Sequence, residues 1–240
     1  MSEEIVFRKE ILKKKKFDEL LADDPTFMLR HFDEIVKRKK TFFGHVKILD
    51  IGAGPCIFGY YCSIKSKACS VISLDVSIDA LRASDSLFGF REGRICGDSL
   101  RLPCRSEAFN VVFCSAFLHH LQEITPVLFE CRRVLKDGGK IIAINEPCAP
   151  PFILTEIIYK RLFGKAKKRK GITEKPRTSS EYVKAFSKVF GNVNLDIDRF
   201  KTERNIQKHG FLWRLCYRAL RKSYFTVAPF AVIITATKHM

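Results

Sequence analysis

A strand that runs into a glycine-rich turn and then into a helix is the strongest structural constraint in this sequence. Residues 46–51 (VKILDI) are mostly apolar and β-prone, contain Asp50, and are followed by Gly52-Ala53-Gly54-Pro55. Glycine lets the backbone approach a ligand where a Cβ would clash. The helix expected next presents unpaired N–H groups at the same place. The pattern predicts a nucleotide-like cofactor at the first strand-to-helix turn of an α/β domain.

Strand-like and helix-like segments alternate from residue 46 onward. We expect strands at 46–51, 69–75, 93–96, 109–115 and 140–145 and helices near 57–66, 77–87 and 123–136, with a tight turn at Gly138-Gly139. Such alternation predicts a parallel sheet with helices on both faces. This alternation ends after Pro147. Further along the chain we expect a helix at about 178–189, a strand at 192–198 and a final strand in VAPFAVIITATK. Two strands without a crossover helix between them predict an antiparallel pair at the sheet edge.

At 240 residues, the chain is long enough to bury a full hydrophobic core. No apolar run reaches the roughly 18–20 residues that span a bilayer, and the acidic N-terminus lacks the apolar core of a secretory signal. Nine cysteines without a CxxC pair fit packing residues in a reduced cytoplasmic compartment better than disulfides or a metal site. The net charge of +17 is concentrated in residues 160–222, where 19 Lys and Arg face 5 Asp and Glu.

Polar side chains follow the ends of several predicted strands, which is where open α/β sheets bind ligands. Asp75 ends the second strand and can accept hydrogen bonds from two ribose hydroxyls, although a helix cap is an alternative role. Asp98 follows the third strand and can receive an exocyclic amine. Together with the glycine turn, these acids predict an adenosine site. A dinucleotide site fits less well because the third glycine of GxGxxG is missing, and the absence of GK[ST] excludes a P-loop.

These segments resemble a known family. VKILDIGAGPC, ISLDVS, GDSLRLPCRSEAFNVVFCSAFLHHL and RRVLKDGGKIIAINEP are similar to the successive motifs of class I S-adenosylmethionine-dependent methyltransferases. The subgroup includes the quinone-biosynthesis C-methyltransferases and many small-molecule methyltransferases. The resemblance covers roughly residues 44–147. It implies a Rossmann-like, seven-stranded, mostly parallel sheet of order 3-2-1-4-5-7-6 with the last strand antiparallel, flanked by helices.

The resemblance also implies a cofactor, S-adenosyl-L-methionine, and a role for individual residues. The residues that would hold its methionine moiety are Asp50, Gly52, Ala53 and Gly54, with Ser115 lining the same side. Asp75 would bind the ribose, Val76 would border the adenine, and Asp98 with Ser99 would contact the adenine amino edge. Cys56 stands where the family often has a third glycine, so the backbone there must accept a Cβ.

Three residues are candidates for the chemistry of transfer. His119 and His120 follow the fourth strand, on the rim where the methyl group would point. Imidazole titrates near neutral pH, so either residue is a candidate general base; an orienting or cofactor-contacting role is the alternative. Glu146 is a candidate acid/base or substrate ligand, with a structural role in a turn as the alternative. No metal site is predicted.

The resemblance implies that the acceptor is enclosed by the N-terminal helices and by the insertion after the fifth strand, here 148–177, which is basic; a second basic insertion spans 199–224. The first begins apolar (PPFILTEIIYKRLFG) and ends in KAKKRK, and the second places Arg214, Arg218 and Arg221 on one helical face. A basic helix with a broad apolar side is typical of an element at an anionic membrane surface. The alternative is that the apolar residues close the pocket and the charges are solvated. A cytoplasmic location, with peripheral membrane association as an option, follows from these features.

We therefore expect one methyltransferase domain over 1–240. Its parts are an N-terminal helical cap (1–43), a cofactor-binding core (44–147), a lid insertion (148–177) and a C-terminal helix and strand pair (178–240). The expected acceptor is a small or lipid-like molecule, including an anionic or membrane-held one, methylated on oxygen or carbon.

Two other functions remain open. Clustered Lys and Arg would suit RNA or another nucleic acid, although CSAF replaces the [DN]PP[YF] signature of amino-methylating nucleic-acid enzymes. A non-catalytic cofactor-binding partner protein is the other alternative. It would be expected to lose Gly52, Gly54, Asp75 or Asp98, and all four are present.

Overall fold

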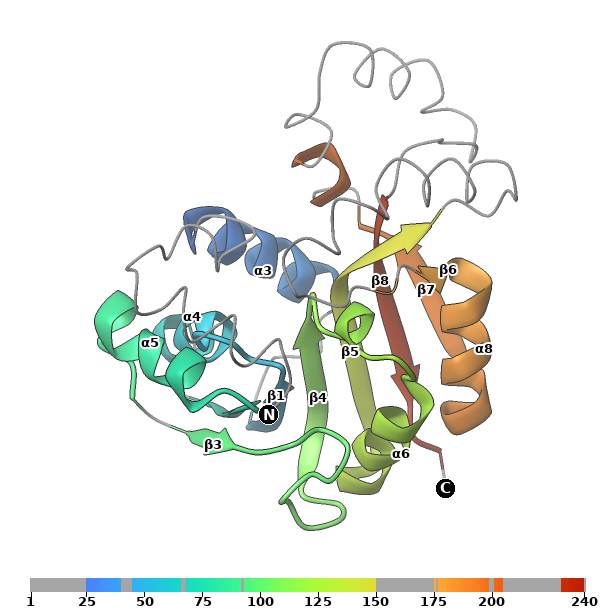
Figure 1. Cartoon of the computed structure of the whole chain (residues 1–240), viewed down its shortest axis with the longest axis horizontal. Helices are drawn as coiled ribbons and strands as arrows, with labels where there is room; N and C mark the ends of the chain where they lie inside the picture. Colours follow the sequence, from blue (N-terminus) through green and yellow to red (C-terminus); the bar gives the residue numbers. More distant parts are fainter. Residues whose placement is uncertain are drawn as a thin grey trace.

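The computed structural model describes residues 25–39, 45–65, 68–91, 93–149, 175, 177–198, 201–204 and 230–239. The elements, in chain order, are α3 (Pro25–Lys39), β1 (Val46–Ile51), α4 (Ile57–Lys65), β2 (Cys69–Asp75), α5 (Ile78–Phe88), β3 (Arg94–Cys96), β4 (Phe109–Ser115), the 3-10 turn η1 (Leu118–His120), α6 (Thr125–Val134), β5 (Leu135–Ala149), β6 (Arg177–Thr178), α8 (Ser179–Phe190), β7 (Val193–Ile197) and β8 (Phe230–Thr237) (Figure 1). The expected helices before residue 25 and most of both basic insertions lie outside these residues.

One sheet carries all the strands in the order β3-β2-β1-β4-β5-β8-β7. β1, β2, β3, β4 and β5 are mutually parallel, whereas β8 runs antiparallel to both β5 and β7. The predicted order 3-2-1-4-5-7-6 is confirmed, since β7 and β8 are its sixth and seventh strands and the two-residue β6 is an addition beside β5. The carboxyl ends of the five parallel strands consequently meet at one edge.

Two apolar cores cover the two faces of this sheet. One packs α6 and α8 against residues such as Leu49, Val112 and Ile141. The other packs α3 and α4 against Ile48, Phe113 and their neighbours. Because adjacent residues of a strand point to opposite faces, the unbroken apolar pattern of the inner strands requires helices on both sides.

Local sequence signals set several helix ends. α3 begins at Pro25, the residue suited to a first helical position. Ser77 caps α5 by accepting a hydrogen bond from Ala80 N, and Gly89 ends that helix with a left-handed backbone. Thr178 and Glu181 form a reciprocal capping box at the start of α8.

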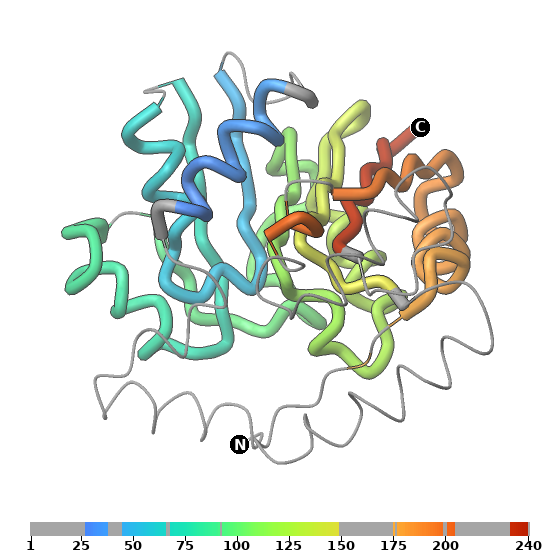
Figure 2. Tube along the Cα trace, turned by 90° about the horizontal axis from the view of Figure 1, so that it is seen from above, coloured from blue at the N-terminus to red at the C-terminus, as the bar shows by residue number. Residues whose placement is uncertain are grey.

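A buried hydrogen bond joins α3 to the short segment that follows β7. His31 Nε2 lies 2.8 Å from Asp198 Oδ2, and both side chains are fully buried. The Arg204 guanidinium lies 4.7 Å from the centre of the Phe27 ring. Residues 201–204 therefore lie beside α3, as seen from above (Figure 2).

β5 is longer than the predicted 140–145. It already pairs at Leu135 with Phe109, and β5 has three more residues than β4 before the next pair, Val111 with Lys140. Gly138 has a left-handed φ of +73° there, so the chain turns at Gly138-Gly139 as expected, but within the strand. A second irregularity between Ala143 and Glu146 places Asn145 at φ +59, because β5 has an extra residue there relative to β8. Glu146 is therefore a buried residue within the strand rather than part of a turn after it.

The first insertion leaves and rejoins the sheet at adjacent positions. Cys148 of β5 pairs with Arg177 of β6, and Ala149 pairs with Thr178. Among the helices of the described residues, none has the length and apolar character needed to cross a membrane.

Candidate functional site

The glycine turn after β1 adopts the backbone that its sequence predicts. Gly52 and Gly54 have φ of +66° and +53°, values that favour glycine. A Cβ on Gly52 would collide with the Phe117 ring, whereas a Cβ on Gly54 would meet nothing within 4 Å. Open space beside Gly54 is what the close approach of a ligand to the backbone requires.

Two acidic residues lie behind this turn. Asp75 Oδ2 accepts a hydrogen bond from Gly54 N at 2.9 Å, and its Oδ1 accepts one from Ser77 N at 2.9 Å. Burial, together with the nearby charge of Asp75, raises the pKa of the Asp50 carboxyl well above its usual range. Ala53 N donates to Leu74 O at 3.0 Å, so the turn is bound directly to the end of β2.

Cys56, at the position of a third glycine, keeps the left-handed backbone that a glycine would have, with φ of +56°. Its side chain is fully buried, and the thiol lies 3.8 Å from Gly54 O and 4.0 Å from Leu81 O. Burial raises the pKa of this thiol to about 12. The turn thus accepts a Cβ, at a strain cost of about 1–2 kcal/mol.

The ends of β2 and β3 present apolar surface beside an acid. Val76 and Leu100 are each 52% exposed, a large fraction for apolar side chains. Asp98 is exposed and its Oδ1 accepts from Leu100 N at 2.9 Å, while Ser99 is buried. Gly97 N donates to Asp75 O at 3.0 Å, which keeps this loop next to Asp75.

The end of β4 is joined to the neighbouring part of β5 by a side-chain hydrogen bond. Asn145 Nδ2 donates to Ser115 Oγ at 2.7 Å. The Asn145 Oδ1 atom is buried and has no hydrogen-bond partner in the part of the chain that the structure describes. A buried carbonyl oxygen of this kind is expected to accept a hydrogen bond from a bound molecule.

Glu146 accepts four hydrogen bonds from the turn that carries the two histidines. Its Oε1 accepts from Phe117 N at 2.8 Å and Leu118 N at 2.9 Å. Its Oε2 accepts from His119 N at 3.1 Å and lies 2.9 Å from His119 Nδ1. Glu146 is fully buried and His119 is 7% exposed. The carboxylate therefore faces the turn and not solvent.

The two histidine rings lie side by side. The centres of the His119 and His120 rings are 4.1 Å apart, at an interplanar angle of 41°. His120 is partly exposed, and His119 is held between this ring and Glu146.

Arg177 contacts the same turn from its other end. Its guanidinium donates to the carbonyl oxygens of Leu118 at 3.0 Å, Gln122 at 2.9 Å and Leu121. A longer hydrogen bond of 3.4 Å reaches Lys175 O. Arg177 is only 4% exposed, so its charge is balanced by carbonyl dipoles in the interior.

The structure thus brings the predicted residues to one edge of the sheet, in two groups. The first group surrounds the glycine turn and comprises Asp50, Gly52, Ala53, Gly54, Asp75, Val76, Asp98 and Ser99. The second lies at the end of β4 and beside it in β5, and comprises Ser115, His119, His120 and Glu146. The Phe117 ring lies over Gly52 and connects the two groups.

Sequence reasoning missed Phe117, Asn145 and Arg177. Asn145 had a signal, because it is a polar residue between an apolar run and the acid of IAINEP. Arg177 directly precedes the capping residue Thr178, which marks the start of a helix. For Phe117, no sequence signal indicated that its ring lies against Gly52.

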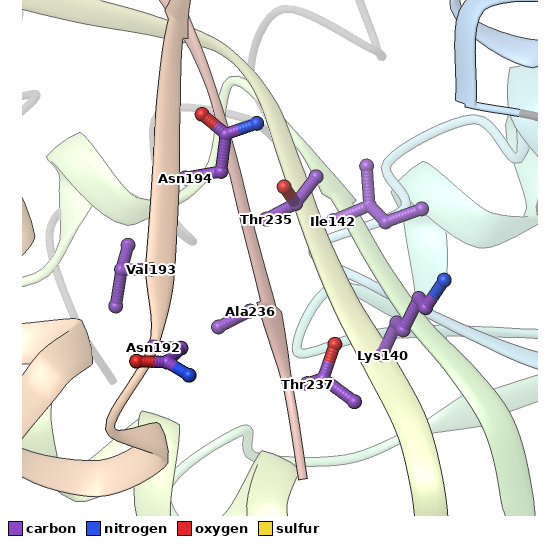
Figure 3. A pocket seen from close by; sticks show the side chains of 8 residues that line it. All are labelled: Lys140, Ile142, Asn192, Val193, Asn194, Thr235, Ala236 and Thr237. Atoms are coloured by element: carbon purple, nitrogen blue, oxygen red, sulfur yellow. The ribbon is translucent and has the colours of Figure 1, made fainter.

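A separate groove of about 370 Å³ lies elsewhere on the sheet (Figure 3). Its lining residues are Lys140, Ile142, Asn192, Val193, Asn194, Thr235, Ala236 and Thr237. Lys140 pairs with Thr237 near the start of β5, away from the carboxyl ends of the parallel strands. The groove is therefore separate from the candidate site.

No group of three or more His, Cys, Asp or Glu side chains arranged to hold a metal ion occurs among the described residues. The residues at the strand ends instead suit an adenosyl ligand. Open space beside Gly54, exposed apolar side chains at Val76 and Leu100, and the unpartnered Asn145 oxygen all fit a bound organic cofactor.

Comparisons with known proteins agree with this geometry. Residues 49–143 match the family model described as a methyltransferase domain. An uncharacterised protein from Methanocaldococcus jannaschii is 32% identical over 127 residues, which are 53% of this chain and 49% of that protein. Demethylmenaquinone methyltransferase from Mycolicibacterium gilvum is 28% identical over 120 residues, half of each chain. The chain therefore spans about half the length of the curated relatives it matches.

Solved structures extend the similarity of the fold. The YcgJ protein from Bacillus subtilis superposes with a TM-score of 0.62 at 16% identity, covering 88% of this chain and 99% of that one. Phosphoethanolamine N-methyltransferase 2 from Haemonchus contortus, in complex with phosphomonomethylethanolamine and S-adenosylhomocysteine, gives 0.66 at 16% identity over 88% of this chain and 52% of its own. With the strand-end residues, the conclusion is that residues 49–143 form a methyltransferase domain and that the chain has the fold of the class I S-adenosylmethionine-dependent methyltransferases.

Proposed function

We propose that this protein transfers a methyl group from S-adenosylmethionine to oxygen or carbon of a small or lipid-like acceptor. The observation that carries the proposal is the 2.9 Å hydrogen bond from Gly54 N to Asp75 Oδ2. It joins the glycine turn of β1 to the acid of β2, so that one ligand can contact both.

The proposed binding roles follow from where each side chain lies. Each Asp75 carboxylate oxygen accepts one backbone N–H and has a further lone pair. These lone pairs accept the hydrogen bonds of the two ribose hydroxyls. Val76 and Leu100 provide apolar surface for the adenine, and Asp98 with Ser99 contacts its amino edge. Asp50, Gly52, Ala53, Gly54 and Ser115 are the proposed contacts of the methionine part.

The chemistry supplied by the bound cofactor is an electrophilic methyl group on a sulfonium, so the protein has to orient a nucleophile and accept its proton. We assign His119 as the base that accepts the proton of the nucleophile. Its Nδ1 lies 2.9 Å from Glu146 Oε2, and a carboxylate can only accept, so Nδ1 carries the hydrogen. His119 Nε2 is then the basic nitrogen. In this scheme Glu146 positions the base and does not itself touch the acceptor, and His120 packs against the ring.

The names of related proteins support a small or lipid-like acceptor. One relative is a demethylmenaquinone methyltransferase, and the structural neighbour from Haemonchus contortus was solved with phosphomonomethylethanolamine. The basic segment 160–222 fits an anionic or membrane-held acceptor, although most of it lies outside the described residues. We propose that the cap 1–43, the insertion 148–177 and the segment 178–240 enclose this acceptor around the core 44–147.

Calorimetric titration with S-adenosylmethionine tests the proposal. The wild-type protein is expected to bind it, and Asp75→Asn is expected to bind about 10–100-fold more weakly, because a charge-assisted hydrogen bond contributes roughly 1.5–3 kcal/mol. Asp79→Asn, an acid in the first turn of α5, is the control and should bind as the wild type does. A folded wild-type protein that binds no cofactor would refute the proposal.

The acceptor is identified by a transfer assay with labelled cofactor. Quinone and phospholipid extracts, a pool of small metabolites and total RNA are offered separately. Label in the lipid or metabolite fraction supports the proposed acceptor class. Label in RNA alone would replace it with the nucleic-acid alternative, and cofactor binding without label in any pool would favour the non-catalytic one.

A further inference from the structure

We propose that Arg177 is a positioning residue for methyl transfer, acting with Glu146 from opposite ends of the η1 turn to fix the orientation of His119. The inference rests on the proposed function, in which His119 is the base. It adds a residue 58 positions further along the chain, within the first basic insertion.

Within the described residues, the hydrogen bonds of the Arg177 guanidinium go to residues 118–122 and to Lys175. Every hydrogen bond that its guanidinium makes with the described residues goes to a carbonyl oxygen, on Leu118, Leu121, Gln122 and Lys175. Five N–H donors in a planar fork can satisfy several carbonyls at once, which a lysine ammonium cannot do in the same geometry.

The two buried charges complement the polarity of the turn. Glu146 accepts the N–H groups of Phe117, Leu118 and His119 at the start of the turn. Arg177 donates to Leu121 O and Gln122 O, just after the last residue of the turn, and also to Leu118 O. A negative charge at the N-terminal end and a positive one at the C-terminal end match the direction of the peptide dipoles. A single turn of 3-10 helix has little stability of its own, so these two side chains define its conformation.

This conformation decides where the His119 ring points. The His119 backbone is held on both sides, since its N–H donates to Glu146 Oε2 and its carbonyl accepts from Lys175 N at 2.8 Å. Without Arg177, Leu121 O would lose the donor that the structure gives it, while Leu118 O would keep Leu121 N and Gln122 O would keep Lys175 Nζ, so the turn would lose its link to β6 and would rearrange. The 2.9 Å contact between His119 Nδ1 and Glu146 would then be lost.

Nitrogen NMR of the histidine side chains tests this without an acceptor or a cofactor. The protein is labelled with ¹⁵N-histidine, and His119→Gln identifies the His119 signals among the six histidines. The wild type is expected to show one His119 tautomer, with the hydrogen on Nδ1. In Arg177→Met, a mixture of the two tautomers is expected.

Arg133→Met is the matched control. Arg133 also donates to loop carbonyls, those of Leu102 and Cys104, but it lies on α6 and does not contact the η1 turn. This variant is expected to lose stability while the His119 signals stay as in the wild type. Equal changes in both variants would mean that the His119 signals report only general loosening, and would overturn the proposal.

An unchanged His119 tautomer in folded Arg177→Met would also overturn it. If Arg177→Met fails to fold, Arg177→Lys decides the question, because it keeps the charge but cannot reach all four carbonyls. A wild-type His119 signal in Arg177→Lys would contradict the proposal, and a mixed one would support it. Cofactor titration of the wild type is a separate measurement, so failure of the proposed function is distinguishable from failure of this inference.

Discussion

Glu146→Gln is the substitution with the most informative expected outcome. The carboxylate accepts four hydrogen bonds, two at each oxygen. A glutamine amide has one oxygen, which can keep two of these donors, and one NH₂ group, which faces the other two. If the oxygen remains near Phe117 and Leu118, the NH₂ group points at His119 N and His119 Nδ1.

His119 can relieve one of these conflicts by moving its ring hydrogen from Nδ1 to Nε2. Nδ1 would then accept from the glutamine, and Nε2 would no longer be a base. The backbone N–H of His119 would still face another donor, which costs about 1–3 kcal/mol for a buried group. The hydrogen bonds from Phe117 N and Leu118 N remain, but their acceptor is now a neutral amide, so each is weaker. The variant also no longer buries a charge, which offsets part of this loss of stability. The expected net destabilisation is about 2–4 kcal/mol.

Urea denaturation and thermal unfolding measure this value. For a chain of this length, 2–4 kcal/mol corresponds to a decrease in Tm of about 5–15 °C. Glu123→Gln is the control, because Glu123 follows the same turn but is 75% exposed, and its ion pair with Lys175 lies at the surface. It should change stability by less than about 0.5 kcal/mol.

Equal stability of the two variants would refute the role assigned to Glu146. The ¹⁵N-histidine spectrum of Glu146→Gln should also show His119 with its hydrogen on Nε2. A loss of stability with the Nδ1 tautomer retained would keep the packing argument but refute the assignment of His119 Nε2 as the base.

Other parts of the site lead to further expectations. Gly52→Ala should lower Tm much more than Gly54→Ala, because a Cβ on residue 52 would collide with the Phe117 ring. A Cβ on residue 54 would only strain the backbone, by about 1–2 kcal/mol. Equal effects in thermal unfolding would contradict the close contact between Gly52 and Phe117. Asp50→Asn should raise stability at pH 7, since burial raises the pKa of Asp50 in the folded state and the charged form is disfavoured there. The gain should be absent below about pH 4, where the wild-type carboxyl is protonated in both states, and grow as pH rises; a gain that is independent of pH would show another cause. Peptide mapping after alkylation at pH 8.5 should find the exposed Cys96 modified well before Cys56, whose burial raises its pKa to about 12; similar rates would contradict the burial of the Cys56 thiol.

Much of the fold could be predicted because its strands and helices have local signatures. The bounds expected for β1, β2 and β4 agree with the structure, since each is a short, mostly apolar and β-prone run. β5 could not be predicted as well. Its extension to Ala149 depends on pairing with β8 and β6, and the irregularity before Glu146 exists only in register with β8.

The candidate site divides in the same way. Asp75 and Gly54 could be placed together because the carboxyl ends of adjacent parallel strands meet, and their spacing in sequence implies adjacent strands. The hydrogen bonds of Glu146 could not be foreseen, because they depend on a bulge that turns this side chain toward η1. Arg177 was beyond prediction for another reason: nothing local relates it to the carbonyls of residues 118–122.

The pairing of Cys148 with Arg177 has a consequence for how the first insertion can vary in length. Its two ends lie opposite each other on the adjacent strands β5 and β6, about 4.8 Å apart. Closing a loop on such a fixed base costs entropy that grows only logarithmically, by about 0.6 kcal/mol for each doubling of length. Residues can therefore be gained or lost between these two positions at little thermodynamic cost and without shifting the register of the sheet. A chimaera that exchanges this segment between relatives should keep the unfolding cooperativity of the parent.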